Sequence, residues 1–243
     1  MSGGDGRPVP RCSLAFIPAR GGSKRIPRKN IIDFFGKPML AYPIEAALRS
    51  GRFDCVHVST DDDEIAAIAQ QHGADVSFRR PPDLSDDHTP LLPVMQWTLR
   101  EFARLGRSFS DVCTLFPCAP LVEAQDIAAA YDVFDANSGR RNLLTVARAP
   151  VPAEWYYHME ADGRLVPVVP GGAFVRSQDL KPAYYETGTF TIFSAEWALA
   201  DGREQDDTNY IAYELPAEKA VDIDTPEDLE RARRAFQMQL RDA

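Results

Sequence analysis

Short, unbroken apolar runs recur along this chain with helix-like patterns between them, and this alternation most restricts its fold. Leu14–Pro18 (LAFIP) is the first such run, and a run without polar alternation is typical of a strand buried on both faces. The other runs are Cys55–Ser59, Ala74–Phe78, Val112–Phe116, Leu143–Ala147, Thr189–Phe193 and Ile211–Leu215. Strands that alternate with helices predict an α/β fold, Rossmann-like, with a mostly parallel sheet and helices on both faces.

Helical spacing marks the segments between these runs. The expected helices are residues 61–72, 91–105, 124–136 and the stretch after Thr225. Gly73 suits the left-handed position that follows a helix, and Thr225 with Asp228 forms a capping box at the start of the last one. The buried stripe of that last helix is predicted to contain Leu229, Ala232, Phe236 and Leu240.

The alternation breaks between about residues 150 and 186, where prolines and aromatic residues gather. Asp162-Gly163 inside this segment is typical of a hairpin turn. We interpret the segment as an insertion that either covers an active site or builds a subunit interface, because exposed aromatic residues would otherwise be unfavourable. Residues 13–243, which include this insertion, are expected to form one domain after a flexible tail of residues 1–12.

Charge and composition exclude several classes of protein. The chain has 243 residues and a formal net charge of -9, which argues against a general nucleic-acid coat or an anionic membrane surface as partner. No apolar run approaches the ~20 residues that span a bilayer, and Met1–Pro10 lacks the apolar core of a signal peptide. Four cysteines without C-x-x-C spacing suggest reduced core residues. A cytoplasmic protein is expected.

The segment from Ile17 to Ile31 (IPARGGSKRIPRKNI) follows the first predicted strand and is strongly basic. Its cations are Arg20, Lys24, Arg25, Arg28 and Lys29. Gly21 and Gly22 let the backbone turn sharply toward phosphate oxygens, and Ser23 adds a hydroxyl. The spacing matches neither a Walker motif nor G-x-G-x-x-G. A solvated basic turn is the alternative, but ligands bind at the carboxyl ends of strands in such sheets, which favours a polyphosphate site.

Two aspartates precede the C-terminal helix. In an extended segment Asp222 and Asp224 point to one side, while Val221 and Ile223 point into the core. Mg²⁺ is commonly held by one or two carboxylates together with substrate phosphates, so the pair suits this cation. Aspartate is also common ahead of helices for capping. Thr225 already fills the cap, which leaves the pair without a structural task.

Taken together, these motifs resemble the CMP-sialic acid synthetases, the acylneuraminate cytidylyltransferase family. The basic segment is similar to the family's nucleotide-binding signature, and four further blocks agree in order. These blocks are Phe78–Thr89 (FRRPPDLSDDHT), Thr114–Leu121 (TLFPCAPL), Arg176–Phe190 (RSQDLKPAYYETGTF) and Asp222–Thr225 (DIDT). The resemblance spans roughly residues 14 to 240.

Within the family the sequence looks most like the pseudaminic acid branch. Phe116 stands where the N-acetylneuraminate enzymes typically carry a glutamine, and Val122 stands where they carry an arginine. An aromatic face instead of an amide favours a less polar sugar, such as a 6-deoxy sugar with acylamino groups. Enzymes for N-acetylneuraminate, legionaminate or the octulosonate sugar KDO remain alternatives.

The resemblance also implies residue roles. For the nucleotide it implies Ala19, Arg20, Gly21, Gly22, Ser23, Lys24, Lys29, Asn30, Arg80, Asp86, Asp87 and Thr89, with Arg80 beside the cytosine. For the sugar it implies Phe116, Arg176, Gln178, Tyr185, Thr187 and Phe190. For Arg80 the structural alternative is a surface ion pair with Asp83. For Arg176 it is a salt bridge in a subunit interface.

The implied reaction is attack by the anomeric hydroxyl of an acidic nine-carbon sugar on the α-phosphorus of CTP, giving CMP-sugar and pyrophosphate. Arg20, Lys29, Asp222 and Asp224 are the expected catalytic residues, with Mg²⁺ on the two aspartates. No dedicated base is evident, so a metal-held aspartate or a metal-bound water is expected to take the proton. The family also implies a homodimer built through the insertion. A non-catalytic nucleotide-binding module is the alternative of another class.

Overall fold

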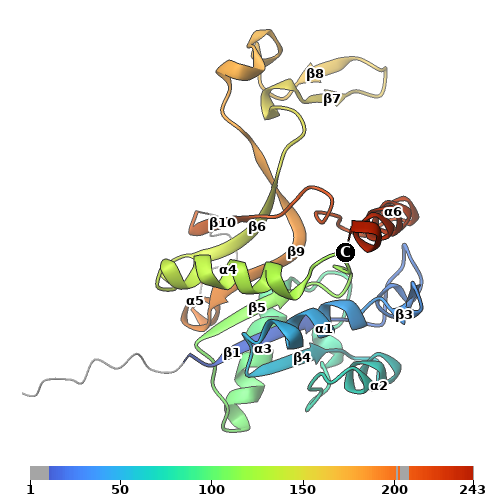
Figure 1. Ribbon diagram of the computed structural model, residues 1–243, viewed down its shortest axis with the longest axis vertical. Helices are drawn as coiled ribbons and strands as arrows, with labels where there is room; N and C mark the ends of the chain where they lie inside the picture. Colours follow the sequence, from blue (N-terminus) through green and yellow to red (C-terminus); the bar gives the residue numbers. More distant parts are fainter. Residues whose placement is uncertain (1–10, 201, 203–207, 243) are drawn as a thin grey trace, which may run out of the picture.

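The computed structural model describes residues 11–200, 202 and 208–242, and its centre is a six-stranded sheet of order β10-β6-β9-β5-β1-β4 (Figure 1). The strands are β1 (Ser13–Pro18), β4 (Cys55–Ser59), β5 (Asp111–Leu115), β6 (Asn142–Arg148), β9 (Tyr184–Ser194) and β10 (Tyr210–Glu214). Neighbouring strands run parallel except β9, which is antiparallel to β5 and β6. The predicted α/β class with a mostly parallel sheet is confirmed.

Helices cover both faces of this sheet. One face packs against α1 (Ala41–Ser50), α2 (Asp63–Gln71) and α4 (Ala124–Ala136), and the other against α3 (Leu91–Arg104) and α5 (Ala195–Leu199). Successive residues of a strand point to opposite faces, so Ile17 joins the first core and Phe16 the second, both with no exposed surface. This two-sided burial explains the unbroken apolar runs in the sequence.

A third core lies beside the first two. It joins the C-terminal helix α6 (Pro226–Asp242) to a small hairpin of β2 (Asp33–Phe34) and β3 (Lys37–Pro38). The capping box of α6 is as predicted, because Asp228 Oδ2 accepts from Thr225 N at 2.9 Å and Thr225 Oγ1 accepts from Asp228 N at 3.2 Å. Leu229 and Ala232 are buried as expected, but Leu240 is 61% exposed because α6 extends past the core it covers.

Two sequence-based expectations differ from the structure. The run from Ala74 to Phe78 does not form a strand and makes only an isolated bridge between Asp75 and His57. The reason is local, because the Asp75 carboxylate accepts from Ser77 N at 3.2 Å and Ser77 Oγ at 2.6 Å, which turns the chain. Helix α1 was not expected, and α2 begins at Asp63 with Asp62 as its N-cap, two residues after the expected start at residue 61.

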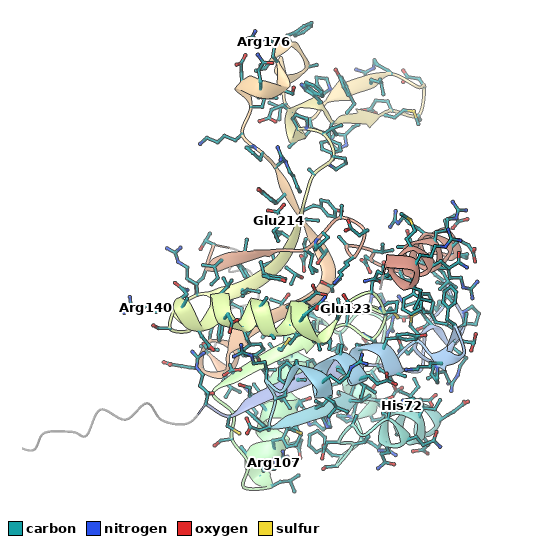
Figure 2. All side chains as sticks on the ribbon, in the orientation of Figure 1. His72, Arg107, Glu123, Arg140, Arg176 and Glu214 are labelled. Carbon is teal, nitrogen blue, oxygen red and sulfur yellow. The ribbon has the colours of Figure 1, made fainter. Side chains whose placement is uncertain are left out.

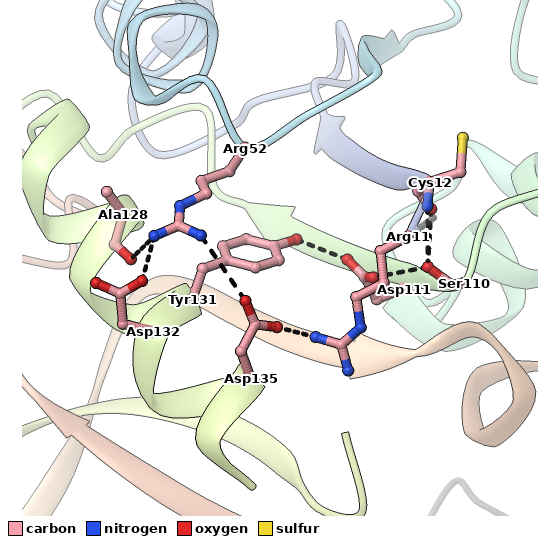
Figure 3. A network of polar contacts seen from close by, with 9 residues as sticks. All are labelled: Arg11, Cys12, Arg52, Ser110, Asp111, Ala128, Tyr131, Asp132 and Asp135. Atoms are coloured by element: carbon pink, nitrogen blue, oxygen red, sulfur yellow. Dashed lines mark hydrogen bonds and ion pairs between the residues drawn. The ribbon is translucent and has the colours of Figure 1, made fainter. Parts of the chain in front are cut away.

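The expected flexible tail of residues 1–12 lies outside the described residues except for Arg11 and Cys12. Figure 3 shows that both belong to a network of polar contacts, which includes Asp111 at the start of β5 and residues of α4. Arg11 pairs with Asp135 of α4, and Tyr131 of the same helix donates to Asp111 at 2.9 Å at the start of β5. The network therefore fixes α4 against the sheet.

An arm of residues 149–183 projects from the sheet between β6 and β9 (Figure 1). It contains a hairpin of β7 (Tyr157–Met159) and β8 (Leu165–Pro167), with Gly163 at φ 84° in the predicted turn. Short 3-10 turns complete it: η3 (Ala153–Trp155), η4 (Gly172–Phe174) and η5 (Ser177–Asp179). The expected insertion is thus present, but residues 184–186 belong to β9, where they pair with the end of β6. Within the described part of the chain, no helix is long and apolar enough to cross a bilayer.

Candidate active site

A pocket of about 410 Å³ opens where the parallel strands β1 and β5 end. Pro18 closes β1 and Phe116 follows β5 at its rim, so the pocket occupies the position where open α/β sheets bind ligands. Its charged lining residues are Arg20, Lys24, Arg25, Lys29, Arg80, Asp86, Asp87, Asp222 and Asp224. The basic segment, the RPPDLSDD block and the two C-terminal aspartates, far apart in sequence, therefore meet at one place.

Gly21 in the basic segment allows a close approach to the start of α2, whereas a Cβ at Gly22 would meet nothing within 4 Å. Gly21 N donates to Asp61 Oδ1 at 3.0 Å, and a Cβ at Gly21 would lie 2.8 Å from Asp62 Oδ2. Arg28 pairs with Asp62 and Glu64 on the same helix and does not line the pocket. Ala19 is fully buried, and its N–H donates to Ser59 O at 2.9 Å. These contacts fix the loop that carries the cations of the pocket.

The cations in the pocket are held by its carboxylates in two groups. Arg20 and Lys24 both pair with Asp87, and these hydrogen bonds lower the pKa of Asp87 to about 2. Lys29 Nζ lies 3.1 Å from Asp224 Oδ1 and donates to Ile223 O at 2.5 Å. Arg25 approaches the other oxygen of Asp224 at 2.9 Å. Arg20 and Lys29 are thus largely shielded from bulk solvent, whereas the side chains of Lys24 and Arg25 stay 80% and 66% exposed.

Asn30 is buried beneath the basic loop. Its amide donates to Arg20 O at 2.9 Å, and its Oδ1 accepts from Cys118 Sγ at 3.4 Å. Both residues line the pocket, and burial raises the pKa of Cys118 to about 12, so its thiol stays protonated. Asn30, which the resemblance places at the nucleoside, thus also joins the basic loop at Arg20 to the loop that contains Cys118.

Arg80 is 7% exposed and lines the pocket. Its Nε donates to Ser59 Oγ at 3.2 Å and its Nη2 to Ser59 O at 2.7 Å. Burial lowers its pKa to about 10, which still leaves the guanidinium charged at neutral pH. The ion pair with Asp83 that the sequence left open is absent from the described contacts, and the neighbour Arg79 is exposed and pairs with Asp63.

Asp86 and Thr89 shape the wall beside Arg80. Asp86 Oδ1 accepts from His88 N at 2.8 Å, Thr89 N at 2.7 Å and Thr89 Oγ1 at 2.8 Å. Asp86 O accepts from Arg20 at 3.2 Å. This turn therefore presents Asp87 to the basic loop, and its residues line the pocket as expected.

Asp222 and Asp224 line the pocket, while Val221 and Ile223 are buried in the third core, as the alternation predicted. Burial and the nearby charge of Asp224 raise the pKa of Asp222. Burial also acts to raise the pKa of Asp224, but the hydrogen bond and charge of Lys29, with Arg25, lower it overall. The described contacts include no hydrogen bond or ion pair to the Asp222 carboxylate.

This donor set fits a hard divalent cation. Two carboxylates on one side of a segment supply oxygen ligands, and the unengaged charge of Asp222 favours a cation beside it. Among the described residues no group of three or more His, Cys, Asp or Glu forms a complete metal cage. The pair is therefore suited to an ion that takes its remaining ligands from a bound polyphosphate and water.

The sugar-side residues are less well placed than the sequence suggested. Phe116 lines the pocket. Phe190 is fully buried in the first core, and Thr187 is 1% exposed in a hydroxyl cluster, so neither faces the pocket. Tyr185 is 40% exposed on β9. The place of β9 explains the difference, because this strand lies between β6 and β5 inside the sheet and residues 189–192 are buried on both of its faces.

Arg176 and Gln178 lie on the arm. Figure 2 shows Arg176 at its far end, away from the body. Its Nε pairs with Asp179 Oδ2 at 2.9 Å, a contact within the arm. These two residues therefore do not join the pocket of their own chain.

Sequence reasoning missed two groups of residues, one that lines the pocket and one that supports the basic loop. Leu84 and Val94 add apolar surface to the pocket, and Gly188 lines it next to Asp222. Asp61 and Asp62 support the basic loop from the start of α2. The available signal for the last pair was the acidic run Asp61–Glu64 (DDDE) at the start of the helix expected over residues 61–72.

A Rossmann-like sheet with a cationic pocket at the carboxyl ends of its parallel strands defines a nucleotide-binding α/β protein. Residues 14–140 match the family described as cytidylyltransferase. The chain belongs to this family, and it is a CTP-dependent nucleotidyltransferase.

The chain is similar to two relatives in sequence and to one solved structure in fold. It is 36% identical over 222 residues to the pseudaminic acid cytidylyltransferase of Campylobacter jejuni, covering 91% of this chain and 94% of the relative. It is 30% identical over 222 residues to the CMP-N,N'-diacetyllegionaminic acid synthase of Legionella pneumophila, covering 88% and 92%. A CMP:2-keto-3-deoxy-manno-octonic acid synthetase solved with CTP shares the fold, with a TM-score of 0.68, 16% identity and coverage of 94% and 99%.

Proposed function

We propose that this protein activates an acidic nine-carbon sugar, with pseudaminic acid favoured, by transferring CMP to it from CTP and releasing pyrophosphate. The convergence of the basic loop, Arg80 and the Asp222–Asp224 pair in one pocket is the observation that carries the proposal. The similarity to the Campylobacter enzyme over nearly the whole chain supports the sugar class. Phe116 at the rim supports a sugar less polar than N-acetylneuraminate.

Different pocket residues have different roles in the proposed reaction. Arg20, Lys24 and Lys29 bind the triphosphate, and Arg20 and Lys29 stabilise the charge that develops on the leaving pyrophosphate. The attacking anomeric hydroxyl must lose a proton. Carboxylates are among the acceptors of the described lining residues, and Asp222 is the one with no described hydrogen bond or ion pair to its carboxylate. Asp86 accepts from Thr89, and Asp87 and Asp224 pair with cations.

Asp222 and Asp224 are the residues that would hold Mg²⁺. When bound, the ion would supply neutralisation of phosphate charge and polarisation of the reacting oxygens. Before that, Lys29 and Arg25 keep Asp224 ionised, as its lowered pKa indicates. The fit of the pair to a hard cation supports Mg²⁺ as the cofactor.

The arm supports a homodimer. It exposes several large apolar side chains, among them Met159 at 76% and Phe174 at 93%. Apolar side chains that gather on one exposed segment are typical of a protein–protein interface. We propose that these side chains pack against a second copy of the chain and that Arg176 and Gln178 reach the sugar site of that copy. We further propose that the protein works in the cytoplasm, where CTP is made.

The test is a pyrophosphate-release screen. Each ribonucleoside triphosphate is combined with pseudaminate, legionaminate, N-acetylneuraminate and KDO, with and without Mg²⁺. The proposal expects turnover with CTP and Mg²⁺, fastest with pseudaminate. Equal turnover with all triphosphates, or none with any nine-carbon sugar, contradicts it.

A further inference from the structure

We infer that Gly188, which lies in a bulge of β9, is a positioning residue for Asp222. Because Gly188 has no side chain, the Asp222 carboxylate can lie directly against it, and this contact sets where the carboxylate lies in the pocket. The inference rests on the proposed function, because it takes Asp222 as a metal ligand of the CTP complex. Gly188 itself lines the pocket beside Asp222, so its effect would reach the bound metal and nucleotide through that carboxylate.

The contact between the two residues leaves no room for a side chain. A Cβ at Gly188 would lie 2.9 Å from Asp222 Cγ and 3.0 Å from Asp222 Oδ2. Carbon atoms do not approach a carboxylate so closely, so any other residue at this position displaces the carboxylate or the strand. Because no described donor or cation engages Asp222, this packing is the contact that limits its position from the β9 side.

The backbone at Gly188 is also held in an unusual conformation. Its φ is +62°, which lies in the left-handed region that side chains with a Cβ rarely adopt. The pairing of β6 with β9 shifts register between Leu144 and Val146, opposite this point. The glycine therefore sits in a β-bulge, a feature that re-aims a strand next to a site.

Buried hydroxyl groups hold this bulge in place. Thr145 Oγ1 lies 2.8 Å from Thr187 Oγ1 and 2.9 Å from Thr189 Oγ1, and it donates to Phe190 O at 2.6 Å. All three threonines are 1% exposed. Phe116 N donates to Thr189 O at 2.9 Å, which ties the bulge to the pocket rim. The strand is thus not free to retreat from a side chain at position 188, and the carboxylate must move instead.

A matched control exists elsewhere in the chain. Gly51, at the end of α1, has φ +66°, yet a Cβ there would meet nothing within 4 Å. Gly51→Ala therefore carries the same backbone strain as Gly188→Ala without the contact to Asp222. The difference between the two variants isolates the effect of the displaced carboxylate.

The experiment measures CTP binding by calorimetry in the absence of sugar, once with EDTA and once with Mg²⁺. The ratio of the two dissociation constants reports how strongly metal and nucleotide are coupled. We expect a ratio of about tenfold or more for the wild type and for Gly51→Ala, and a ratio near one for Gly188→Ala. The dissociation constant of Gly188→Ala in EDTA should stay within about twofold of the Gly51→Ala value, because the cations that bind phosphate are unchanged.

A second pair of variants applies if Gly188→Ala does not fold. Thr145→Val removes the central hydroxyl of the bulge, and Thr114→Val removes a fully buried hydroxyl of β5 that bonds only to Met95 Sδ among its described partners. We expect Thr145→Val to lower the coupling ratio several-fold and Thr114→Val to leave it unchanged.

The outcomes separate this inference from the proposed function. A wild type without metal coupling overturns the metal assignment and the inference with it. A coupled wild type whose Gly188→Ala variant matches Gly51→Ala overturns only the role of Gly188. If Gly188→Ala is unfolded, equal ratios for the two threonine variants overturn it in the same way.

Discussion

The body of the protein buries its large apolar side chains, whereas the arm exposes them. In the body Phe16, Phe102 and Phe134 have no exposed surface. Within residues 149–183 of the arm only Gly172 is buried, and Phe174 is 93% exposed. The body can thus be stabilised by its own burial, but the arm has too little buried surface to be stabilised in the same way.

The charged residues differ in the same sense. In the body, cations from the basic loop reach carboxylates more than sixty positions away, as Arg20 does with Asp87 and Lys29 does with Asp224. In the arm, Arg176 pairs with Asp179 three residues later. The comparison indicates that long-range ion pairs organise the pocket within one chain, whereas the pair in the arm is local.

The largest expected effect concerns the pocket. Asp222→Asn should lower kcat/KM on the order of 10²-fold or more, because it removes an oxygen charge that would hold the metal. The melting temperature in EDTA should stay equal or rise, because the raised pKa of Asp222 shows that its charge is disfavoured by burial and by Asp224. Pyrophosphate release over a Mg²⁺ titration and thermal melting measure both.

Glu227→Gln is the control for this variant, since Glu227 is exposed and does not line the pocket. If the Asp222→Asn variant melts many degrees lower than the wild type in EDTA, Asp222 has a structural role rather than the proposed role in the metal site.

The next effect concerns the arm. The double variant Met159→Ser with Phe174→Ser should turn a dimer into a monomer in light scattering, because each large apolar side chain contributes ~1.5–3 kcal/mol when fully buried. The melting of the monomeric body should not change. Leu105→Ser is the control, since Leu105 is 59% exposed on the body. A double variant that keeps the wild-type mass would show that the arm does not need these side chains for assembly.

Arg80 tests how the body recognises the base. Arg80→Ala should lower the preference for CTP over UTP by roughly 5- to 150-fold, which corresponds to a loss of ~1–3 kcal/mol for a buried charged hydrogen bond. Cytosine N3 accepts a hydrogen bond, whereas uracil N3 carries a hydrogen, so a guanidinium beside it favours cytosine. Competitive turnover of the two nucleotides measures the ratio. Arg79→Ala should leave it unchanged, and equal ratios for both variants would remove Arg80 from base recognition.

A smaller effect concerns the pH dependence of the stability of the body. His57 is fully buried in the body, and burial lowers its pKa, although its Nδ1 lies 2.9 Å from Asp75 Oδ1. Below the ordinary histidine pKa of about 6.5 the unfolded chain binds a proton that the folded chain resists. The stability is therefore complete above that pH and falls as the pH drops, by at most about 1.4 kcal/mol per unit for one proton.

Urea unfolding at pH 7, 6 and 5 measures this slope. His57→Phe should flatten it, and His158→Phe in the exposed β7 strand should not. An unchanged slope in His57→Phe would assign the acid sensitivity to other groups.

The smallest expected effect concerns Asp87. Asp87→Asn should tighten CTP binding in EDTA by no more than a few-fold, because it releases Arg20 and Lys24 from an exposed ion pair. Asp83→Asn in the same loop is the control. Weaker CTP binding in Asp87→Asn would instead mean that the carboxylate contacts the nucleotide directly.

Much of the fold and half of the site could be predicted from local patterns. Residue chemistry within a few positions predicts α4, the capping box at Thr225, the turn at Gly163 and the strand runs other than Ala74–Phe78. The Asp222–Asp224 geometry followed from strand alternation alone. The antiparallel direction of β9 did not, because it depends on how the chain returns from the arm.

The sequence by itself therefore determined the α/β class, the basic loop after the first strand and the carboxylate pair before the last helix, since each depends on short-range periodicity and side-chain type. Only the tertiary structure decided which residues share the pocket. Phe190 and Thr187 face the core rather than a ligand, Arg176 lies on the arm, and Gly188 packs against a carboxylate 34 positions further along the chain. The physical reason is that such contacts depend on strand register and bulges, which are set by long-range pairing that no local pattern encodes.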